Sequence, residues 1–133
     1  MTTVLLATDS DDLFNDVDAA LASAETDVLR VKAGAHVLPA CKARQPDLVL
    51  LDLQIGNMGG IATCLALKQE MSSDRLSPIP VGLFLDRSVD VFLAGEATAD
   101  GWLIKPLDSL RIRRLSTTLQ SGESIFEGAA TSA

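Results

Sequence analysis

The sequence has little of what metal clusters and disulfide frameworks need. It contains two cysteines, Cys41 and Cys64, and one histidine, His36. The cysteines form no CxxC pair, and a single histidine cannot supply the Cys/His spacing typical of zinc sites. We therefore expect two reduced thiols in the core and no zinc cluster.

Positive charge and long apolar runs are also scarce. The formal net charge is -7, which opposes attraction to nucleic-acid phosphates and to anionic membranes. The start, Met1 to Asp9, lacks the basic and apolar regions of a signal peptide, and no later apolar run reaches membrane-spanning length. We therefore expect a cytoplasmic protein with neither nucleic acid nor membrane as a partner.

Aromatic residues make up only 4% of the sequence, whereas hydrophobic residues make up 47%. The core must then consist of Leu, Val, Ile and Ala, which favours layered α/β packing. The 133 residues suit one domain, which we expect over residues 1–120. Residues 121–133 have only Ile125 and Phe126 as apolar anchors, so we expect most of this tail to fray.

Short apolar runs alternate with segments of helical spacing. The predicted strands are Val4–Ala7, Val28–Val31, Leu48–Leu51, Pro80–Leu85 and Trp102–Ile104. The predicted helices start at Ser10 or Asp11 with an apolar stripe to Ala24, and then cover Ala35–Arg44 (with a kink at Pro39), Gly60–Met71, Ser88–Ala97 and Leu107 or Asp108 to Leu119. This alternation indicates a doubly wound parallel sheet with helices on both faces, because parallel strands need crossover connections.

Three polar residues stand where predicted strands stop. Asp9 follows the first strand, Asp52 the third and Lys105 the fifth. In a doubly wound sheet, the carboxyl ends of the strands share one edge, where ligands bind. Taken singly, Asp52 fits a strand-end turn and Lys105 a solvated surface lysine. Together with Asp9, they indicate one pocket.

Two motifs resemble those of the receiver domains of bacterial response regulators. Pro46 to Ile55, followed by Gly60, is similar to the phosphoacceptor strand and loop of that family, and Ala99 to Asp108 is similar to its fifth-strand motif. The similarity in pattern runs from about Val4 to Leu119. It implies a flavodoxin-like, five-stranded parallel sheet of order 2-1-3-4-5 flanked by five helices.

The resemblance also implies a chemistry. Asp52 would be the nucleophile that accepts a phosphoryl group, and Lys105 would contact that group. Mg²⁺ would be held by Asp9, Asp52 and the backbone carbonyl of Gln54. The Lys105–Pro106 bond would be cis. Such a protein is a phosphoacceptor in signalling and not an enzyme, although it can catalyse its own phosphotransfer and dephosphorylation.

The sequence departs from the family pattern at two positions of the expected site. Thr8 stands where the family has an acidic residue, so we expect weak Mg²⁺ binding, with Thr8 holding at most a metal-bound water. Leu85 replaces the Ser or Thr at the end of the fourth strand, and Asp86 adds a negative charge beside it. Trp102 occupies the position of the aromatic switch residue. Core packing explains Leu85 and Trp102 equally well.

Two functions therefore stay open. One is a single-domain response regulator that accepts a phosphoryl group on Asp52 from a sensor histidine kinase or phosphotransfer protein and then contacts an unknown protein target. The other is a pseudo-receiver that works as an interaction module without phosphorylation. The family pattern also leaves a homodimer open. A flavodoxin-like enzyme is disfavoured because no Gly-rich phosphate loop follows the first strand.

Overall fold

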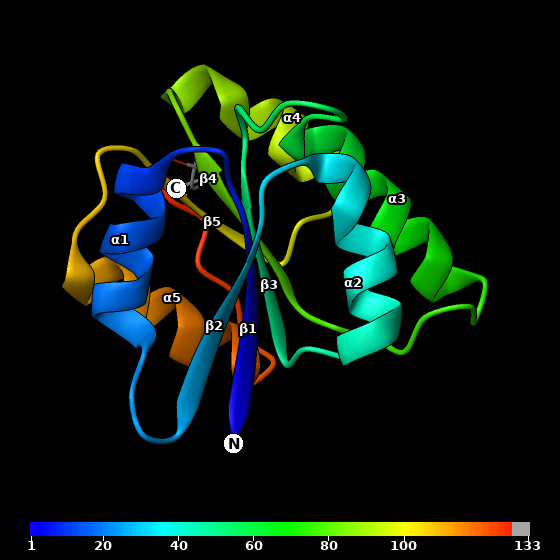
Figure 1. Cartoon of the computed structure of the whole chain (residues 1–133). Coiled ribbons are helices and arrows are strands. Elements are labelled where there is room, and N and C mark those ends of the chain that lie inside the picture. The colour runs from blue at the N-terminus through cyan, green and yellow to red at the C-terminus, as the bar shows by residue number, and fades with distance from the viewer. Residues whose placement is uncertain (129–133) are drawn as a thin grey trace.

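The structure, a computed structural model, describes residues 1–128. Its centre is a five-stranded parallel sheet of order β2-β1-β3-β4-β5, seen nearly edge-on in Figure 1. This order confirms the predicted fold. The strands are β1 Thr2–Ala7, β2 Thr26–Val31, β3 Leu48–Asp52, β4 Val81–Leu85 and β5 Gly101–Ile104.

Helices cover both faces of the sheet, with α1 and α5 on one face and α2, α3 and α4 on the other (Figure 1). Short 3₁₀ turns precede α2 and α4. The helical elements are α1 Asp11–Leu21, η1 Gly34–His36, α2 Val37–Arg44, α3 Gly60–Ser72, η2 Ser88–Asp90, α4 Val91–Glu96 and α5 Ser109–Gln120.

The two-residue period of the strands divides the core into two layers. In β1, Val4 and Leu6 pack with α1 and α5, whereas Leu5 and Ala7 pack with α2 and α3. All four side chains are at most 2% exposed. Strands buried on both faces read as continuous apolar runs, which is why the sequence identified β3 and β4, whereas the edge strand β2 is only partly buried.

Side-chain caps fix where α1 and α5 begin. The Ser10 hydroxyl accepts a hydrogen bond from Leu13 N at 3.2 Å, and the Asp108 carboxylate accepts one from Arg111 N at 2.9 Å. These bonds satisfy amide groups that have no partner within the helix. Pro39 is the third residue of α2, so it lies in the first turn, where proline is tolerated. The predicted kink assumed that Pro39 lies in the interior of the helix, and this assumption is wrong.

Apolar spacing alone does not give the bounds and the buried faces of the helices at several positions. Helix α1 ends at Leu21, so Ala24 lies outside it. In the last helix, Leu110 is 60% exposed, while Ile112 is fully buried. In η2 and α4, the large apolar side chains Val89 and Phe92 are exposed, and the small Ala94 is buried. The small side chain of Ala94 lets this short helix lie close to the sheet. The hydrophobicity of the larger residues does not indicate that they face outward.

The C-terminal segment is more ordered than the sequence suggested. Beyond α5, Ile125 O accepts a hydrogen bond from Trp102 N at 2.8 Å, and Glu127 N donates to Trp102 O at 3.4 Å. Residues 125–127 therefore pair with the edge strand β5, and the segment, orange to red in Figure 1, runs alongside it. We expected most of 121–133 to fray, and the structure pairs residues 125–127 of this tail with the sheet. Residues 129–133 lie outside the described part.

Over residues 1–128, none of the helices has the length and apolar character needed to cross a membrane.

Burial separates two phenylalanines that the sequence alone does not distinguish. Phe84 in β4 is fully buried, whereas Phe92 in α4 is 71% exposed. We expect Phe84→Ala to lower the free energy of unfolding by about 3–5 kcal/mol, because a cavity is left in the core. The matched control, Phe92→Ala, should change it by no more than about 0.5 kcal/mol. Urea unfolding followed by circular dichroism measures both, and equal losses would contradict the described packing.

Candidate functional site

The carboxyl ends of β1, β3 and β5 bring polar side chains together: Asp52 and Lys105 meet as predicted, but the residue after β1 that contacts Asp52 is Thr8 and not Asp9. The Asp52 carboxylate, 3% exposed at the end of β3, lies 2.7 Å from Lys105 Nζ at the end of β5. Its other oxygen lies 2.7 Å from the hydroxyl of Thr8, which follows β1. A buried carboxylate needs such partners, so Asp52 is held by Thr8 and Lys105 in addition to the turn that follows β3.

Asp52 accepts hydrogen bonds at both carboxylate oxygens. Lys105 Nζ and Gln54 N, the latter at 3.1 Å, donate to Oδ1, and Thr8 Oγ1 donates to Oδ2. The Gln54 amide is placed by the turn that follows β3, in which Ile55 N donates to Asp52 O at 3.3 Å. These donors hold the carboxylate in one orientation.

Lys105 is shared between two carboxylates. Its Nζ also donates to Asp86 Oδ1 at 2.8 Å. Burial alone would lower the pKa of Lys105, but the hydrogen bonds to Asp52 and Asp86 and their negative charges raise it above 10.5. Burial opposes the ionisation of Asp86, yet hydrogen bonds from Lys105 and Gln54 and the nearby positive charges hold its pKa below 3.8. Both groups are therefore charged at neutral pH.

Thr8 is fully buried, and its hydroxyl is used within the protein. It donates to Asp52 and accepts a hydrogen bond from Ser10 N at 3.0 Å. The Thr8 carbonyl accepts one from Arg30 Nε, also at 3.0 Å. Where an acidic residue would repel Asp52, Thr8 holds it. A water-mediated metal contact of Thr8 remains a prediction.

The remaining oxygen donors fit a magnesium ion only sparsely. Asp9 is exposed, and its Oδ2 faces the loop after β3, 3.8 Å from where a Cβ on Gly56 would lie. Among residues 1–128, no group of at least three His, Cys, Asp or Glu side chains is arranged to hold a metal. Mg²⁺ accepts one or two carboxylates when water completes its shell. Magnesium binding by Asp9, Asp52 and the Gln54 carbonyl therefore stays a prediction.

The two predicted switch positions are both buried. Leu85 is fully buried among the apolar side chains of the α2–α3–α4 layer, and Trp102 is 5% exposed in the same layer. Leu85 offers no hydrogen-bond donor to the site. The Trp102 indole Nε1 donates to Glu127 O at 2.8 Å, so the C-terminal segment holds this ring.

Sequence reasoning missed how two residues act. It treated Asp86 only as a repelling charge, whereas the structure pairs it with Lys105. It did not predict the contacts of Arg111, whose guanidinium donates to the carbonyls of Ile104 and Pro106, at 2.9 and 2.8 Å, and pairs with Glu127. An acidic residue directly after β4 was a usable signal for Asp86. The Arg111 contacts had none, because Glu127 lies in the segment expected to fray.

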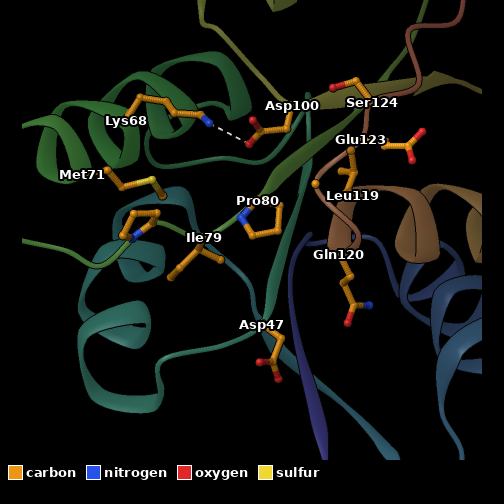
Figure 2. A pocket seen from close by; sticks show the side chains of 12 residues that line it. Asp47, Lys68, Met71, Ile79, Pro80, Asp100, Leu119, Gln120, Glu123 and Ser124 are labelled. Atoms are coloured by element: carbon orange, nitrogen blue, oxygen red, sulfur yellow. Dashed lines mark hydrogen bonds and ion pairs between the residues drawn. The ribbon is translucent and has the colours of Figure 1, made fainter.

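Pockets lie at both ends of the sheet. One of about 240 Å³ opens beside Asp52 and Lys105. Another, of about 410 Å³, lies at the amino ends of the strands, between Asp47, Pro80 and Asp100. Figure 2 shows that Lys68 in this second pocket points to Asp100, at 2.6 Å. Ligands of doubly wound sheets bind at the carboxyl ends, and the pocket beside Asp52 meets that rule.

Comparison with protein families is decisive. The family model for the response regulator receiver domain matches residues 4–116. The chain belongs to the receiver-domain family. Receiver domains are signalling proteins of two-component systems, and they typically bind Mg²⁺ at the phosphorylation site.

Curated relatives of this receiver domain are longer proteins. It is 36% identical to the DNA-binding response regulator MtrA of Mycolicibacterium paratuberculosis, over 68% of this chain and 42% of MtrA. It is 30% identical to the transcriptional regulatory protein CseB of Streptomyces avermitilis, over 90% of this chain and 49% of CseB. The chain thus spans less than half the length of these relatives.

Solved structures support the fold. The chemotaxis protein CheY4 of Vibrio cholerae superposes with a TM-score of 0.77 at 19% identity, covering 90% of this receiver domain and 98% of CheY4. The receiver domain of a histidine kinase from Syntrophus aciditrophicus gives 0.80 at 25% identity, covering 92% of each chain.

The Asp86–Lys105 pair predicts how stability depends on pH. A carboxyl group with a lowered folded-state pKa stabilises the fold above its unfolded-state pKa, and this contribution disappears as the pH falls through the folded-state pKa. We therefore expect Asp86→Asn to destabilise the protein most at neutral pH and progressively less as the pH falls below 3.8. Urea unfolding at neutral pH and at a pH below 3.8 measures this difference in the free energy of unfolding. The exposed Asp27→Asn on β2 is the control, and a constant Asp86→Asn effect would contradict the pairing.

Proposed function

We propose that this receiver domain accepts a phosphoryl group on Asp52 from a sensor histidine kinase or a phosphotransfer protein in the cytoplasm. The observation that carries the proposal is the 2.7 Å contact between Lys105 Nζ and the buried Asp52 carboxylate, next to an open pocket. The Lys105 ammonium group forms an ion pair with this carboxylate. The same ammonium group lies beside the pocket, where it can bind an incoming phosphoryl group.

The transfer is a displacement at phosphorus. An Asp52 oxygen attacks the phosphorus of a phosphohistidine, the P–N bond breaks, and the electron pair stays on the imidazole nitrogen, which then takes up a proton. The product on Asp52 is an acyl phosphate. Mg²⁺, held by Asp9, Asp52 and the Gln54 carbonyl, would neutralise phosphoryl oxygens when bound.

Asp86 and Thr8 act on the state before transfer. The carboxylate of Asp86 already lies 2.8 Å from Lys105, so an incoming phosphoryl group must compete with it for the ammonium. The Thr8 hydroxyl occupies one lone pair of Asp52, which lowers the number of oxygen sites open to a metal or to phosphorus. Both features favour slow phosphorylation.

A pseudo-receiver is the second candidate, and one observation favours it. Fully buried Leu85 gives no hydroxyl to a phosphoryl oxygen, so the site lacks the group that would report phosphorylation to β4 and β5. In that case the chain binds its protein target without phosphorylation. Although MtrA is named as DNA-binding, the net charge of -7 supports a protein target for this chain in either case.

Phosphorylation is tested with acetyl phosphate and Mg²⁺ on the whole chain. We expect intact-mass spectrometry to show the addition of one phosphoryl group and peptide mapping to place it on Asp52. Asp52→Asn should abolish it, and Lys105→Met should reduce it. As a control, Lys68→Met, which changes a lysine at the other end of the sheet, should leave it unchanged. A chain that stays unmodified while retaining a protein target would establish the pseudo-receiver instead.

Thr8→Asp tests the placement of Thr8 at the metal site. A second carboxylate next to Asp9 should tighten Mg²⁺ binding by about tenfold or more, because ligand charge raises affinity for a hard cation. Calorimetric titration of Mg²⁺ measures this, with Thr8→Ser as the control. If the Mg²⁺ affinity of Thr8→Asp matches that of the unchanged chain, Thr8 does not lie at the metal site.

A further inference from the structure

The edge strand β5 is occupied by the chain's own C-terminal segment. Residues Ile125 to Gly128, here called the capping segment, run parallel to β5, and Phe126 pairs with Trp102. The aromatic rings of Phe126 and Trp102 lie 4.6 Å apart between centroids, with an interplanar angle of 43°. Edge strands present unpaired amides that accept another strand. Here that strand is supplied in cis.

The contacts of the capping segment show which chemistry this edge accepts. Main-chain carbonyls of the segment take the Trp102 amide and the Trp102 indole N–H, each at 2.8 Å. The Glu127 carboxylate takes Ile104 N at 2.8 Å and forms a two-pronged pair with the Arg111 guanidinium. The hydrogen bonds from Arg111, followed by that from Ile104 N, hold the pKa of Glu127 below 4.5 despite its burial. The edge thus recognises an extended backbone, an aromatic ring and a carboxylate one residue later.

Two glycines make room for this arrangement. A Cβ on Gly101 would lie 2.9 Å from Ile125 O, so only glycine lets the capping segment approach β5 here. Gly128, at a φ of +68°, lies between Ile104 and Val91, where a Cβ would come within 2.7 Å of Ile104 Cδ1. The segment therefore ends between β5 and α4, whose neighbouring side chains Val89 and Phe92 are exposed.

The capping segment is held mainly through polar contacts to Trp102, Ile104 and Arg111, and Ile125 is its partly buried apolar side chain packed against the core. The connection from Ser121 to Ser124 is exposed, and Phe126 is itself 46% exposed. Segments with few buried apolar contacts open at low free-energy cost. Opening would leave the amides of Trp102 and Ile104 and the Arg111 guanidinium without their present partners, and a binding partner must supply equivalents.

We propose that the β5 edge is a docking groove for an extended peptide segment of a partner protein, one that presents an aromatic residue followed directly by an acidic residue. The capping segment occupies this groove in cis and competes with that partner. The proposal deepens the proposed function, because it gives the chemistry of the protein target. It requires no phosphoryl transfer.

The test uses the whole chain, with Phe126→Ala and Glu127→Ala combined to release the capping segment. The probe is the synthetic peptide Ser-Gly-Glu-Ser-Ile-Phe-Glu-Gly, which copies residues 121–128. Trp102 is the only tryptophan, so its fluorescence reports on the groove directly. Glu123→Ala, a change of the same residue type in the exposed connection, is the control.

We expect the released variant to show red-shifted Trp102 emission and to bind the peptide saturably, with the shift reversed. The unchanged chain and the Glu123→Ala control should bind at least about tenfold more weakly, because their groove is open only for a fraction of the time. Glu127→Gln alone should give an intermediate affinity, and it provides the test should the double variant fail to fold. A peptide with alanine in place of its Phe and its second Glu should not bind.

Equal affinity of the unchanged chain and the released variant would overturn the proposal, as would absence of peptide binding to both. A released variant that forms a dimer in sedimentation without binding the peptide would also overturn it, since the groove would then take a second copy of the chain. No phosphodonor is present. Failure here therefore leaves Asp52 phosphorylation untouched, and failure of phosphorylation leaves this binding test untouched.

Discussion

The site depends on the two ion pairs that the Lys105 ammonium group forms with the carboxylates of Asp52 and Asp86. Parallel strands end at one edge of the sheet, so residues separated by 53 positions lie 2.7 Å apart. Without this positive charge, the 3%-exposed Asp52 carboxylate would lack its ion-pair partner. The pair therefore belongs both to the fold and to the chemistry of the site.

The turn that carries Lys105 is held from two sides. Arg111 donates to the carbonyls of Ile104 and Pro106, and Glu127 binds both Arg111 and the amide of Ile104. Arg111 and Glu127 thus connect the C-terminal segment to the residues that flank Lys105. The groove that we assign to a partner and the site that we assign to phosphorylation share this short stretch of β5. Binding at one has a direct structural route to the other.

The sequence predicted the strands, the sheet and the meeting of Asp52 with Lys105. Apolar runs mark the strands, and polar residues at the carboxyl ends of parallel strands lie at one edge of the sheet. It did not predict how hydrogen bonds are distributed within the site. Thr8 reads as a missing acidic residue, yet its hydroxyl holds Asp52, and Asp86 reads as a repelling charge, yet it holds Lys105.

The tail shows the same limit at longer range. Ile125 and Phe126 stand in a polar, glycine-containing stretch, and nothing in their spacing indicates a strand. Their order comes from the edge of β5, from the Trp102 ring and from Arg111. Such tertiary partners lie outside any window of sequence. Likewise, the exposure of Phe92 follows from how the short α4 lies on the sheet, and the burial of Phe84 from its place under α1 and α5 on the other face.

In the proposed reaction, the Lys105 ammonium group leaves Asp86 and binds the phosphoryl group that Asp52 carries. The most direct measurement is a crystal structure of the whole chain with Mg²⁺ and beryllofluoride, an analogue of the phosphoryl group. We expect the analogue on Asp52, with Lys105 Nζ turned from Asp86 to a fluoride. A structure in which Asp52 carries no analogue and Lys105 stays between the two carboxylates would contradict it.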